Sequence, residues 1–322
     1  MKIQLNIIIP VHNEAAGIAS NLAGIMASLT AQHLDREVDW RLLVVDDGSS
    51  DDTLNQLETL ARQDPRIQPI AFTRNFGKES AILAGLRHSG NADVVVVMDS
   101  DLQHPPDLIG GMLSLWRQGY KVVTCVKDDR GDEGLFSALF ARTFYRLFRW
   151  MSGYDLANHT DFKLLDREVV TAYCDLPEGR RFFRGLIAWL GYPSASIRFA
   201  VPRRGEGSSA WTRVKLMRYA ISALTDFSAA PLYLITWLGG LVFLLGLVLA
   251  LVSVYQKLTG TGATGFTTLI VFLFLTTGPI MVSLGLIGHY LGELFLELKG
   301  RPSYVIRRGP DAAASGGMGV DS

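Results

Sequence analysis

The sequence predicts an α/β domain with a mostly parallel, doubly wound sheet, followed by a hydrophobic region that is embedded in a membrane. Three observations support this fold class. Short β-branched runs alternate with amphipathic stretches over the first 130 residues. Polar clusters follow three of these runs directly, at residues 10–14, 46–52 and 99–104. Residues 229–296, by contrast, are almost free of charged side chains.

The elements of the first domain follow from hydrophobic periodicity. Runs with the length and valine content of doubly buried strands lie at residues 5–9, 42–46, 67–72, 94–99 and 122–126. Helical periodicity is found at residues 14–29, 52–63, 78–88 and 107–118. Ser50 or Asp51 can cap the second of these helices. Alternating strands and helices predict βαβ units, whose ligands bind beyond the carboxyl ends of the strands.

Further elements are expected after residue 130. A basic, aromatic helix, a strand, a pair of helices and a last strand are predicted at residues 134–152, 160–165, 169–190 and 195–201.

The composition argues against several other classes. Lysine plus arginine and aspartate plus glutamate each number 31, so the net charge is zero and does not favour nucleic-acid binding. The two cysteines, Cys125 and Cys174, have no metal-type spacing, and we expect buried, reduced thiols. The N-terminal apolar run is short and is cut by Pro10, so we expect no signal peptide and no export of this domain.

Two segments are candidates for membrane spans. Residues 231–255 and 266–291 each exceed the ~20 apolar residues that a helix needs to cross a bilayer. The linker between them carries Lys257, whereas basic residues cluster before the first segment and after the second. Those residues are Arg213, Lys215, Arg218, Lys299, Arg301, Arg307 and Arg308. The positive-inside rule then predicts a multi-pass protein of the inner membrane with both termini in the cytoplasm.

A helix at residues 211–227 is expected to lie in the membrane interface, and packing against the α/β domain is the alternative. Gly285, Gly288 and Gly292 lie near one face of the second span and favour close helix packing, within a subunit or between subunits. We expect a homo-oligomer, with a tetramer as one form. The predicted parts are the α/β domain, a juxtamembrane helix, a two-span domain and a cytoplasmic tail, at residues 1–209, 210–228, 229–293 and 294–322.

The most informative polar cluster begins with Asp99 and Asp101. Two carboxylates at the end of a buried strand repel each other unless positive charge lies nearby. A divalent cation that bridges to a diphosphate meets this need, and hard oxygen ligands suit Mg²⁺ or Mn²⁺. A pair of helix-capping aspartates is the alternative, but Gln103 and His104 follow within reach and favour a binding site.

A second acidic cluster follows the predicted strand at residues 42–46. Its last residues are explained by a turn and a helix cap. Asp46 and Asp47 precede that turn, so a carboxylate there could accept a hydrogen bond from a base or a ribose hydroxyl. Glycine-rich phosphate loops are absent from the sequence, which again favours a metal as the partner of any phosphates.

These motifs resemble the nucleotide-sugar domain of the inverting GT-A glycosyltransferases of family 2. The resemblance is carried by IIIPVHNE at residues 7–14, VVDDGSSD at residues 44–51 and DSD at residues 99–101. RNFGKESA at residues 74–81, DLQHPP at residues 101–106 and DFKL at residues 161–164 are similar to the polyprenyl-phosphate branch of that family. This branch includes dolichyl-phosphate mannose synthase and the bactoprenol glucosyltransferases, and the likeness extends to about Arg308.

The resemblance implies roles for individual residues. Five of them would surround the base and ribose of the donor: Pro10, Val11, Asn13, Glu14 and Asp46. Asp99, Asp101 and Gln103 would hold the metal and the diphosphate. Arg203 or Arg204 would face the diphosphate, and we favour Arg204. His12 stands where the family often has tyrosine.

Charge considerations indicate how the transfer would proceed. The second pKa of a phosphate is about 6, so a lipid-phosphate acceptor is nearly dianionic at neutral pH and needs little help from a base. It does need positive charge in order to approach the donor diphosphate. The candidates that follow the strand ending at Asp99 are Lys127, Arg130 and Arg142, with Ser137 as a hydrogen-bond donor. Asp161 could orient sugar hydroxyls or act as a base, and we favour orientation.

The expected function is therefore inverting transfer of a hexose from a nucleotide-sugar donor to a polyprenyl phosphate at the cytoplasmic membrane face. Glucose from UDP-glucose and undecaprenyl phosphate are the first choices, and N-acetylglucosamine, mannose and aminoarabinose are the alternatives. A non-catalytic, membrane-tethered nucleotide-binding subunit is a different possibility, which intact Asp99 and Asp101 disfavour. A processive synthase is disfavoured because the chain has no Gln-x-x-Arg-Trp run.

Overall fold

The computed structural model describes residues 2–34, 37–127, 159–179, 181–199, 230–259 and 265–307. These residues belong to two compact units. The first contains a seven-stranded sheet, the helices that cover it and residues 302–307, and the second contains two long helices.

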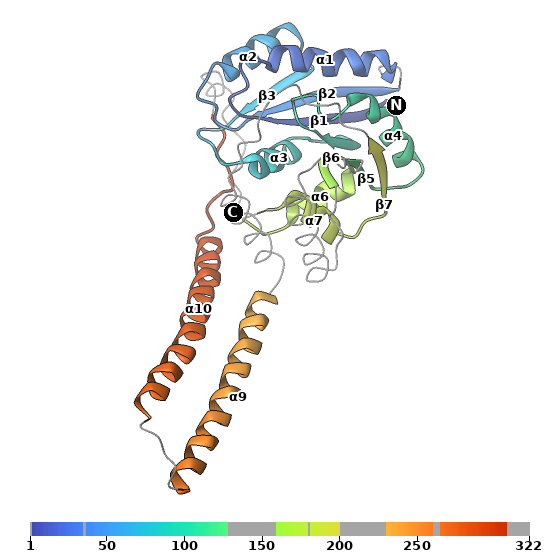
Figure 1. The fold of residues 1–322 in the computed structure, drawn as a ribbon. Helices are drawn as coiled ribbons and strands as arrows, with labels where there is room; N and C mark the ends of the chain where they lie inside the picture. The colour runs from blue at the N-terminus through green and yellow to red at the C-terminus, as the bar shows by residue number, and fades with distance from the viewer. Residues whose placement is uncertain are drawn as a thin grey trace. The chain divides into compact units, whose positions relative to one another are not determined.

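The sheet (Figure 1) has the strand order β3-β2-β1-β4-β6-β5-β7. Its strands are β1 (Ile3–Val11), β2 (Val38–Asp46), β3 (Ile67–Ala71), β4 (Val94–Val97), β5 (Val122–Lys127), β6 (His159–Asp166) and β7 (Ser194–Phe199). The ladders that join β1 to β2, β1 to β4, β2 to β3 and β5 to β7 are parallel. β6 runs antiparallel to both of its neighbours, β4 and β5. The sheet is therefore mixed, which refines the expectation of a mostly parallel one.

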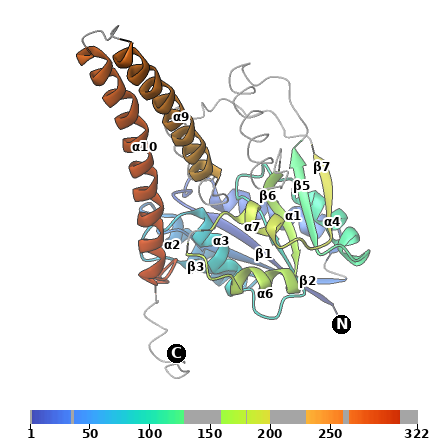
Figure 2. The same ribbon diagram turned by 90° about the horizontal axis from the view of Figure 1, so that it is seen from below.

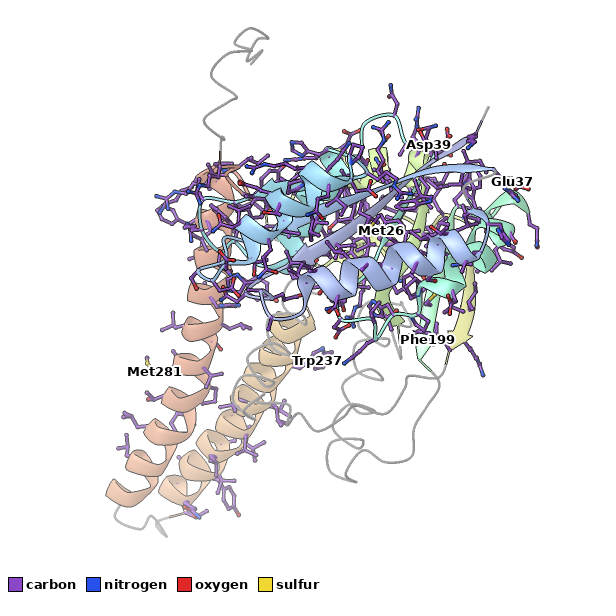
Figure 3. The ribbon with its side chains drawn as sticks, turned by 90° about the horizontal axis from the view of Figure 1, so that it is seen from above. Met26, Glu37, Asp39, Phe199, Trp237 and Met281 are labelled. Carbon is purple, nitrogen blue, oxygen red and sulfur yellow. The ribbon has the colours of Figure 1, made fainter. Side chains whose placement is uncertain are left out.

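Helices cover both faces of the sheet, as expected for a doubly wound domain. The helices of this unit are α1 (Ile18–Ala31), α2 (Thr53–Gln63), α3 (Lys78–Arg87), η2 (Pro106–Leu108), α4 (Ile109–Arg117), α6 (Arg167–Asp175) and α7 (Phe183–Trp189). Seen from above, α1 and α2 lie over the sheet (Figure 3), and seen from below, α3, α6 and α7 lie over it (Figure 2).

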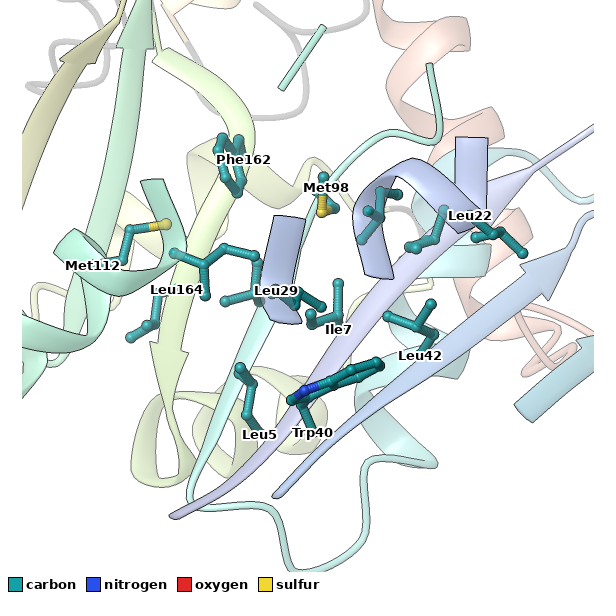
Figure 4. Packing of buried hydrophobic residues seen from close by; sticks show 14 of the residues in the cluster. Leu5, Ile7, Leu22, Leu29, Trp40, Leu42, Met98, Met112, Phe162 and Leu164 are labelled. Atoms are coloured by element: carbon teal, nitrogen blue, oxygen red, sulfur yellow. The ribbon is translucent and has the colours of Figure 1, made fainter. Parts of the chain in front are cut away.

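The main core lies between the sheet and α1 (Figure 4). Alternate residues of β1, such as Leu5 and Ile7, face Leu22 and Leu29 of α1, and these side chains are at most 1% exposed. This alternation is the period-2 pattern of a strand meeting the 3.6-residue period of a helix. On the opposite face, a Cβ atom at Gly85 would lie 2.4 Å from the Ile8 side chain, so glycine lets α3 approach β1 closely.

Most predicted elements are confirmed, with shifted ends. The helix predicted from residue 14 begins at Ile18, because residues 15–17 form a turn first. The strand predicted at residues 94–99 ends at Val97. Asp52 is the backbone cap of α2, but the Asp51 carboxylate accepts the Thr53 N–H at 3.0 Å, as a capping side chain does. The helices predicted at residues 134–152 and 211–227 lie outside the described residues.

The second unit consists of α9 (Ala230–Leu258) and α10 (Phe266–Leu298). One segment of the described chain, Thr276–Leu298, is long and apolar enough to cross a membrane, with a mean hydropathy of 1.4. In α9 the described apolar stretch is shorter, at Gly239–Leu249. Apolar side chains such as Trp237 and Met281 are 79% and 58% exposed (Figure 3). The expectation of two spans stays a prediction.

The two long helices approach each other at a glycine that was not singled out from the sequence. A Cβ atom at Gly246 of α9 would lie 2.7 Å from the Phe272 ring of α10. Around Gly285, Gly288 and Gly292 no described atom lies within 4 Å of such a Cβ position. Contact between the described parts of α9 and α10 therefore does not use these three glycines.

Candidate active site

The candidate site lies where β1, β2 and β4 end side by side. Val11 of β1 pairs with Asp46 of β2, and Ile8 of β1 pairs with Val97 of β4. The polar residues that follow these strands therefore come together at one edge of the sheet. The contact between the Ser100 hydroxyl, which donates, and the Glu14 carboxylate joins the first and third of the predicted clusters.

Several hydrogen bonds tie the loop after β1 to the loop and helix start after β2. Asn13 has a left-handed backbone with φ of 54°. Its N–H donates to the Ser49 hydroxyl at 2.9 Å, and its side-chain oxygen accepts the Ser50 N–H at 2.8 Å. The Glu14 N–H donates to the Thr53 hydroxyl at 2.9 Å, and the Ala15 N–H donates to Asp51 at 3.1 Å. Asn13 therefore fixes the path of the chain as well as lying at the predicted base and ribose site.

The two aspartates that end β2 have different surroundings. Asp46 accepts the Ser49 N–H at 3.2 Å and the hydroxyl of the same serine. Asp47 accepts the N–H groups of Phe76 and Gly77, at 2.7 and 2.9 Å. Burial raises the pKa of Asp47, and these two backbone bonds offset part of that effect. Asp47 thus holds the loop at residues 73–77, which leaves Asp46 as the candidate for the donor.

The loop at residues 99–104, here called the carboxylate loop, carries the predicted metal ligands. The Asp99 N–H donates to Nδ1 of His104 at 3.0 Å, so that nitrogen is unprotonated. The His104 ring is 3% exposed and stacks on Phe162 at 5.2 Å. The Gln103 N–H donates to Asp101 at 3.1 Å. The buried imidazole therefore anchors the loop, and the Asp99 side chain remains 34% exposed.

The residues present fit a divalent cation that is shared with a diphosphate. Asp99 and Asp101 supply hard carboxylate oxygens, as Mg²⁺ and Mn²⁺ prefer. Burial raises the pKa of Glu14, and the negative charges of Asp101 and Asp99 raise it further, which indicates an excess of negative charge here. In the described part of the chain no cluster of three His, Cys, Asp or Glu residues could hold a metal unaided. Donor oxygens would have to complete the coordination.

Asp161 of β6 lies in a charged cluster with Lys78 and Arg184, here called the Asp161 cluster. Arg184 of α7 donates to both carboxylate oxygens, from Nε at 2.6 Å and from Nη2 at 3.0 Å. Nζ of Lys78, the first residue of α3, lies 2.8 Å from Asp161 and 2.5 Å from Asp99. Burial alone would raise the pKa of Asp161, but Arg184 and Lys78 outweigh burial and hold that pKa well below its usual range. Asp161 is therefore a fixed negative charge.

Sequence reasoning missed Lys78 and Arg184. The motif at residues 74–81 contains Lys78, and that membership is the signal by which it could have been found. Arg184 lies in an ordinary helical pattern, so its pairing with Asp161 depends on how α7 packs against β6.

Two buried titratable groups lie on the same side of the sheet. Lys163 of β6 is 2% exposed and donates to the Thr124 hydroxyl at 2.9 Å. Burial, reinforced by the charge of Arg184, lowers the pKa of Lys163 to about 7. Glu79 of α3 accepts the Phe183 N–H at 2.9 Å, and burial raises the pKa of Glu79 to about 7.

Several predicted residues are not brought into this geometry. Arg130, Ser137, Arg142 and Arg204 lie outside the described residues. Lys127 is the last residue of β5, and its side chain is not described. Pro10 and Val11 belong to β1, and the Val11 side chain is 1% exposed within the core, so a contact of Val11 with a base would have to use its backbone.

Both cysteines are free thiols. Cys125 is buried, as expected, whereas Cys174 is only partly buried.

Comparison with known proteins identifies the family. The model of the family described as Glycosyl transferase family 2 matches residues 6–173. A glycosyltransferase of Synechocystis sp. is 36% identical over 95% of this chain and 95% of its own length. A bactoprenol glucosyl transferase of Shigella phage SfII is 30% identical over 95% of this chain and 98% of its own length.

Similarity to one solved structure is lower. The glucosyl-3-phosphoglycerate synthase of Mycobacterium tuberculosis gives a TM-score of 0.44 at 21% identity, over 70% of this chain and 80% of that one. The match of the family model, the full-length relatives and the α/β sheet with acidic residues at its carboxyl edge agree with one another. The chain belongs to glycosyltransferase family 2 and has its GT-A-like fold.

Proposed function

We propose that this glycosyltransferase moves a hexose from a nucleotide sugar to a polyprenyl phosphate at the cytoplasmic face of the membrane, with inversion at the sugar carbon. UDP-glucose and undecaprenyl phosphate are the first candidates for donor and acceptor. The support is the 30% identity, over nearly the full length of both chains, to proteins named bactoprenol glucosyl transferase from Shigella phages SfII and SfV. The same reaction with N-acetylglucosamine, mannose or aminoarabinose is the runner-up.

The observation that carries the proposal is the meeting of three loops at one edge of the sheet. Glu14 of the first loop contacts Ser100 of the third. Asp46 pairs with Val11 at the end of β2, directly before the second loop. In this arrangement Asn13, Glu14 and Asp46, with the backbone of Pro10 and Val11, would hold the base and ribose. The donor diphosphate would then reach the carboxylate loop.

Asp99 and Asp101, with Gln103, would hold Mg²⁺ or Mn²⁺ together with the diphosphate. When bound, the cation would neutralise the charge of the leaving nucleoside diphosphate. Basic side chains of the chain would supply the remaining positive charge. Lys127, Arg130 and Arg142 would draw in the acceptor phosphate with Ser137, and Arg204 would face the diphosphate.

Asp161 is better suited to orient the sugar than to remove a proton. A carboxylate held by two cations has a low pKa and is a weak base. The acceptor phosphate is already ionised at neutral pH, since its second pKa is about 6, and needs no base. Asp161 can accept hydrogen bonds from sugar hydroxyls while it remains bound to Arg184 and Lys78.

The membrane arrangement belongs to the proposal as well. α9 and α10 would both span the inner membrane, and residues 211–227 would lie in its interface, with the termini in the cytoplasm. The proposed domain limits are 1–209, 210–228, 229–293 and 294–322. Such an anchor keeps the carboxylate loop at the depth of a lipid phosphate. A homo-oligomer, such as a tetramer, would be compatible with this arrangement.

The test is sugar transfer in membranes that contain the protein. Membranes are incubated with undecaprenyl phosphate and a panel of radiolabelled nucleotide sugars, and the lipid fraction is extracted. We expect labelled lipid with UDP-glucose and none with membranes that contain Asp101→Ala. Labelled lipid from a different nucleotide sugar would identify that sugar, rather than glucose, as the one transferred, and would still support the lipid acceptor. No labelled lipid from any donor, despite tight nucleotide binding, would support a non-catalytic subunit.

A further inference from the structure

The chain returns to the sheet after α10. Residues 302–307, here called the strap, pair with the end of β3, which is the edge strand. The Thr73 N–H donates to the Val305 carbonyl at 3.0 Å, and the Arg307 N–H donates to the Ala71 carbonyl at 2.7 Å. Between these bonds Phe72 and Ile306 form an antiparallel bridge. The strap therefore extends the edge of the sheet by one isolated bridge.

Side-chain packing strengthens this pairing. The ring of Tyr304 stacks on the ring of Phe72, with centroids 5.1 Å apart and planes 12° apart. Phe72 is 2% exposed, and its ring meets the edge of the Phe76 ring at 5.7 Å. A stacked aromatic pair stabilises such a contact beyond the area that it buries. The Phe72 ring therefore contacts both Tyr304 of the strap and Phe76.

The loop at residues 73–77, which the strap contacts, is held at each end. The strap binds Thr73, and the Asp47 carboxylate binds the N–H groups of Phe76 and Gly77. Between them, a Cβ atom at Gly48 would lie 2.2 Å from the Arg74 backbone, so this approach requires glycine. The next residue after the loop is Lys78, which contacts both Asp99 and Asp161.

We propose that the strap is a positioning element: by pairing with the end of β3 it orders the loop at residues 73–77 and thereby sets Lys78 between Asp99 and Asp161. Residues 299–301 separate α10 from the strap, so the strap is the first part of the chain after α10 that pairs with the sheet. The activity part of this inference rests on the proposed function. Its structural part does not, and the two are measured separately.

The structural test is amide hydrogen exchange of the full chain in detergent. A chain that ends after Gly300 lacks the strap, and a chain that ends after Arg308 keeps it and serves as the matched control. We expect the amides of Thr73, Phe76 and Gly77 to exchange at least about tenfold faster without the strap, because the loop opens locally. Faster exchange at Thr73 alone would show that the strap merely covers the sheet edge, and would overturn the proposal.

Point variants keep the test decisive if the shorter chain does not fold. Tyr304→Ala removes the stacking on Phe72, Tyr304→Phe restores it, and Val305→Ala changes a side chain that is 44% exposed. We expect faster exchange at Phe76 and Gly77 in Tyr304→Ala and unchanged exchange in the other two. Equal exchange in Tyr304→Ala and the parent chain would contradict the role of the strap.

The activity test uses the same variants with the donor found in the lipid-labelling experiment. We expect kcat to fall about tenfold in Tyr304→Ala, while KM for the nucleotide sugar changes less than about threefold, because Lys78 contacts Asp99 and Asp161 rather than the residues assigned to the base and ribose. Tyr304→Phe should restore kcat. Loosened exchange with unchanged kcat would overturn the link to Lys78. No activity in the parent chain, with the exchange pattern intact, would count against the proposed function and leave the strap in place.

Discussion

Asp99 of the carboxylate loop and Asp161 of the Asp161 cluster both contact Lys78, but the surroundings of the two carboxylates differ. The Asp161 side chain is 9% exposed and is bound by both Arg184 and Lys78. The Asp99 side chain is 34% exposed, and Lys78 is its close cationic partner among the described residues, with the unprotonated His104 nitrogen 3.8 Å away. The difference indicates a division of roles. Asp161 is part of the fixed framework, whereas Asp99 can exchange one cation for another.

This division predicts a large difference in stability. Asp161→Ala leaves Lys78 and Arg184 without their carboxylate partner and should lower the free energy of unfolding by about 3 kcal/mol. This value is the lower end of the range for a broken buried ion pair, because Lys78 and Arg184 are partly exposed. Asp99→Ala should cost less than about 1 kcal/mol. For a domain of 150–250 residues, 3 kcal/mol corresponds to about 6–12 °C in the midpoint of thermal unfolding. Tryptophan fluorescence of the detergent-purified chains measures it, and equal midpoints would refute the division.

Activity should show the opposite order. Asp99→Asn and Asp101→Asn should lower sugar transfer by about 10²–10³-fold, the range found when a group that stabilises developing charge is removed. Chelation with EDTA should have a similar effect, and Mn²⁺ or Mg²⁺ should reverse it. Glu58→Gln, on the exposed face of α2, is the matched control and should retain full activity. Transfer that persists after chelation and in Asp101→Asn would remove the metal from the proposal.

Lys163 extends the comparison, because it lies on the same face of β6 as Asp161 but has no carboxylate partner among the described residues. Burial lowers the pKa of Lys163 to about 7, from the ordinary value of 10.5. Between these values the folded state binds fewer protons than the unfolded state, so the free energy of unfolding rises with pH through this window. From pH 7 to 9 the rise should be on the order of 2 kcal/mol.

The variant Lys163→Met cannot titrate, so its stability should be flatter between about pH 7 and 10. Lys163→Met should also be more stable than the parent chain at pH 7, because folding of the parent must hold part of its Lys163 amine in the neutral form at that pH. Thermal midpoints at pH 7, 8 and 9 measure the two profiles. Parallel profiles for Lys163→Met and the parent would show that the amine keeps its charge in the folded state.

The fold was largely predictable because most strands are buried on both faces. The four consecutive valines of β4, all buried, predict this strand from the sequence alone. The direction of β6 was not predictable, since it depends on the path of the chain between β5 and β6 rather than on the composition of either strand. The start of α1 was placed four residues early because Glu14 fits a helix locally, whereas tertiary bonds to Thr53 and Ser100 hold it in the preceding loop.

The acidic part of the site was also predictable, and its cationic part was not. Parallel strands place their carboxyl ends together, so Glu14, Asp46 and Asp99 could be grouped from the sequence alone. Lys78 and Arg184 each occupy a helix whose pattern is complete without them. A lysine at the start of a helix carries no signal for a carboxylate more than 80 residues away, as Asp161 is. Only the packing of α3 on β1 and β2, and of α7 on β6, reveals these pairs.

The smallest expected effect isolates the residue that the two aspartates share. In Lys78→Met, Arg184 still donates to both oxygens of Asp161, so the free energy of unfolding should fall by about 1 kcal/mol or less. Asp99 loses its counter-charge, and a nearby unit charge in water is worth about 1 kcal/mol at 4 Å. Binding of Mn²⁺ in the presence of a fixed concentration of nucleoside diphosphate should therefore tighten by about fivefold, as followed by the electron paramagnetic resonance of free Mn²⁺. Arg87→Met, at the other end of α3, should change nothing. Weaker Mn²⁺ binding in Lys78→Met would mean that the amine orders Asp99 for the cation rather than competing with it.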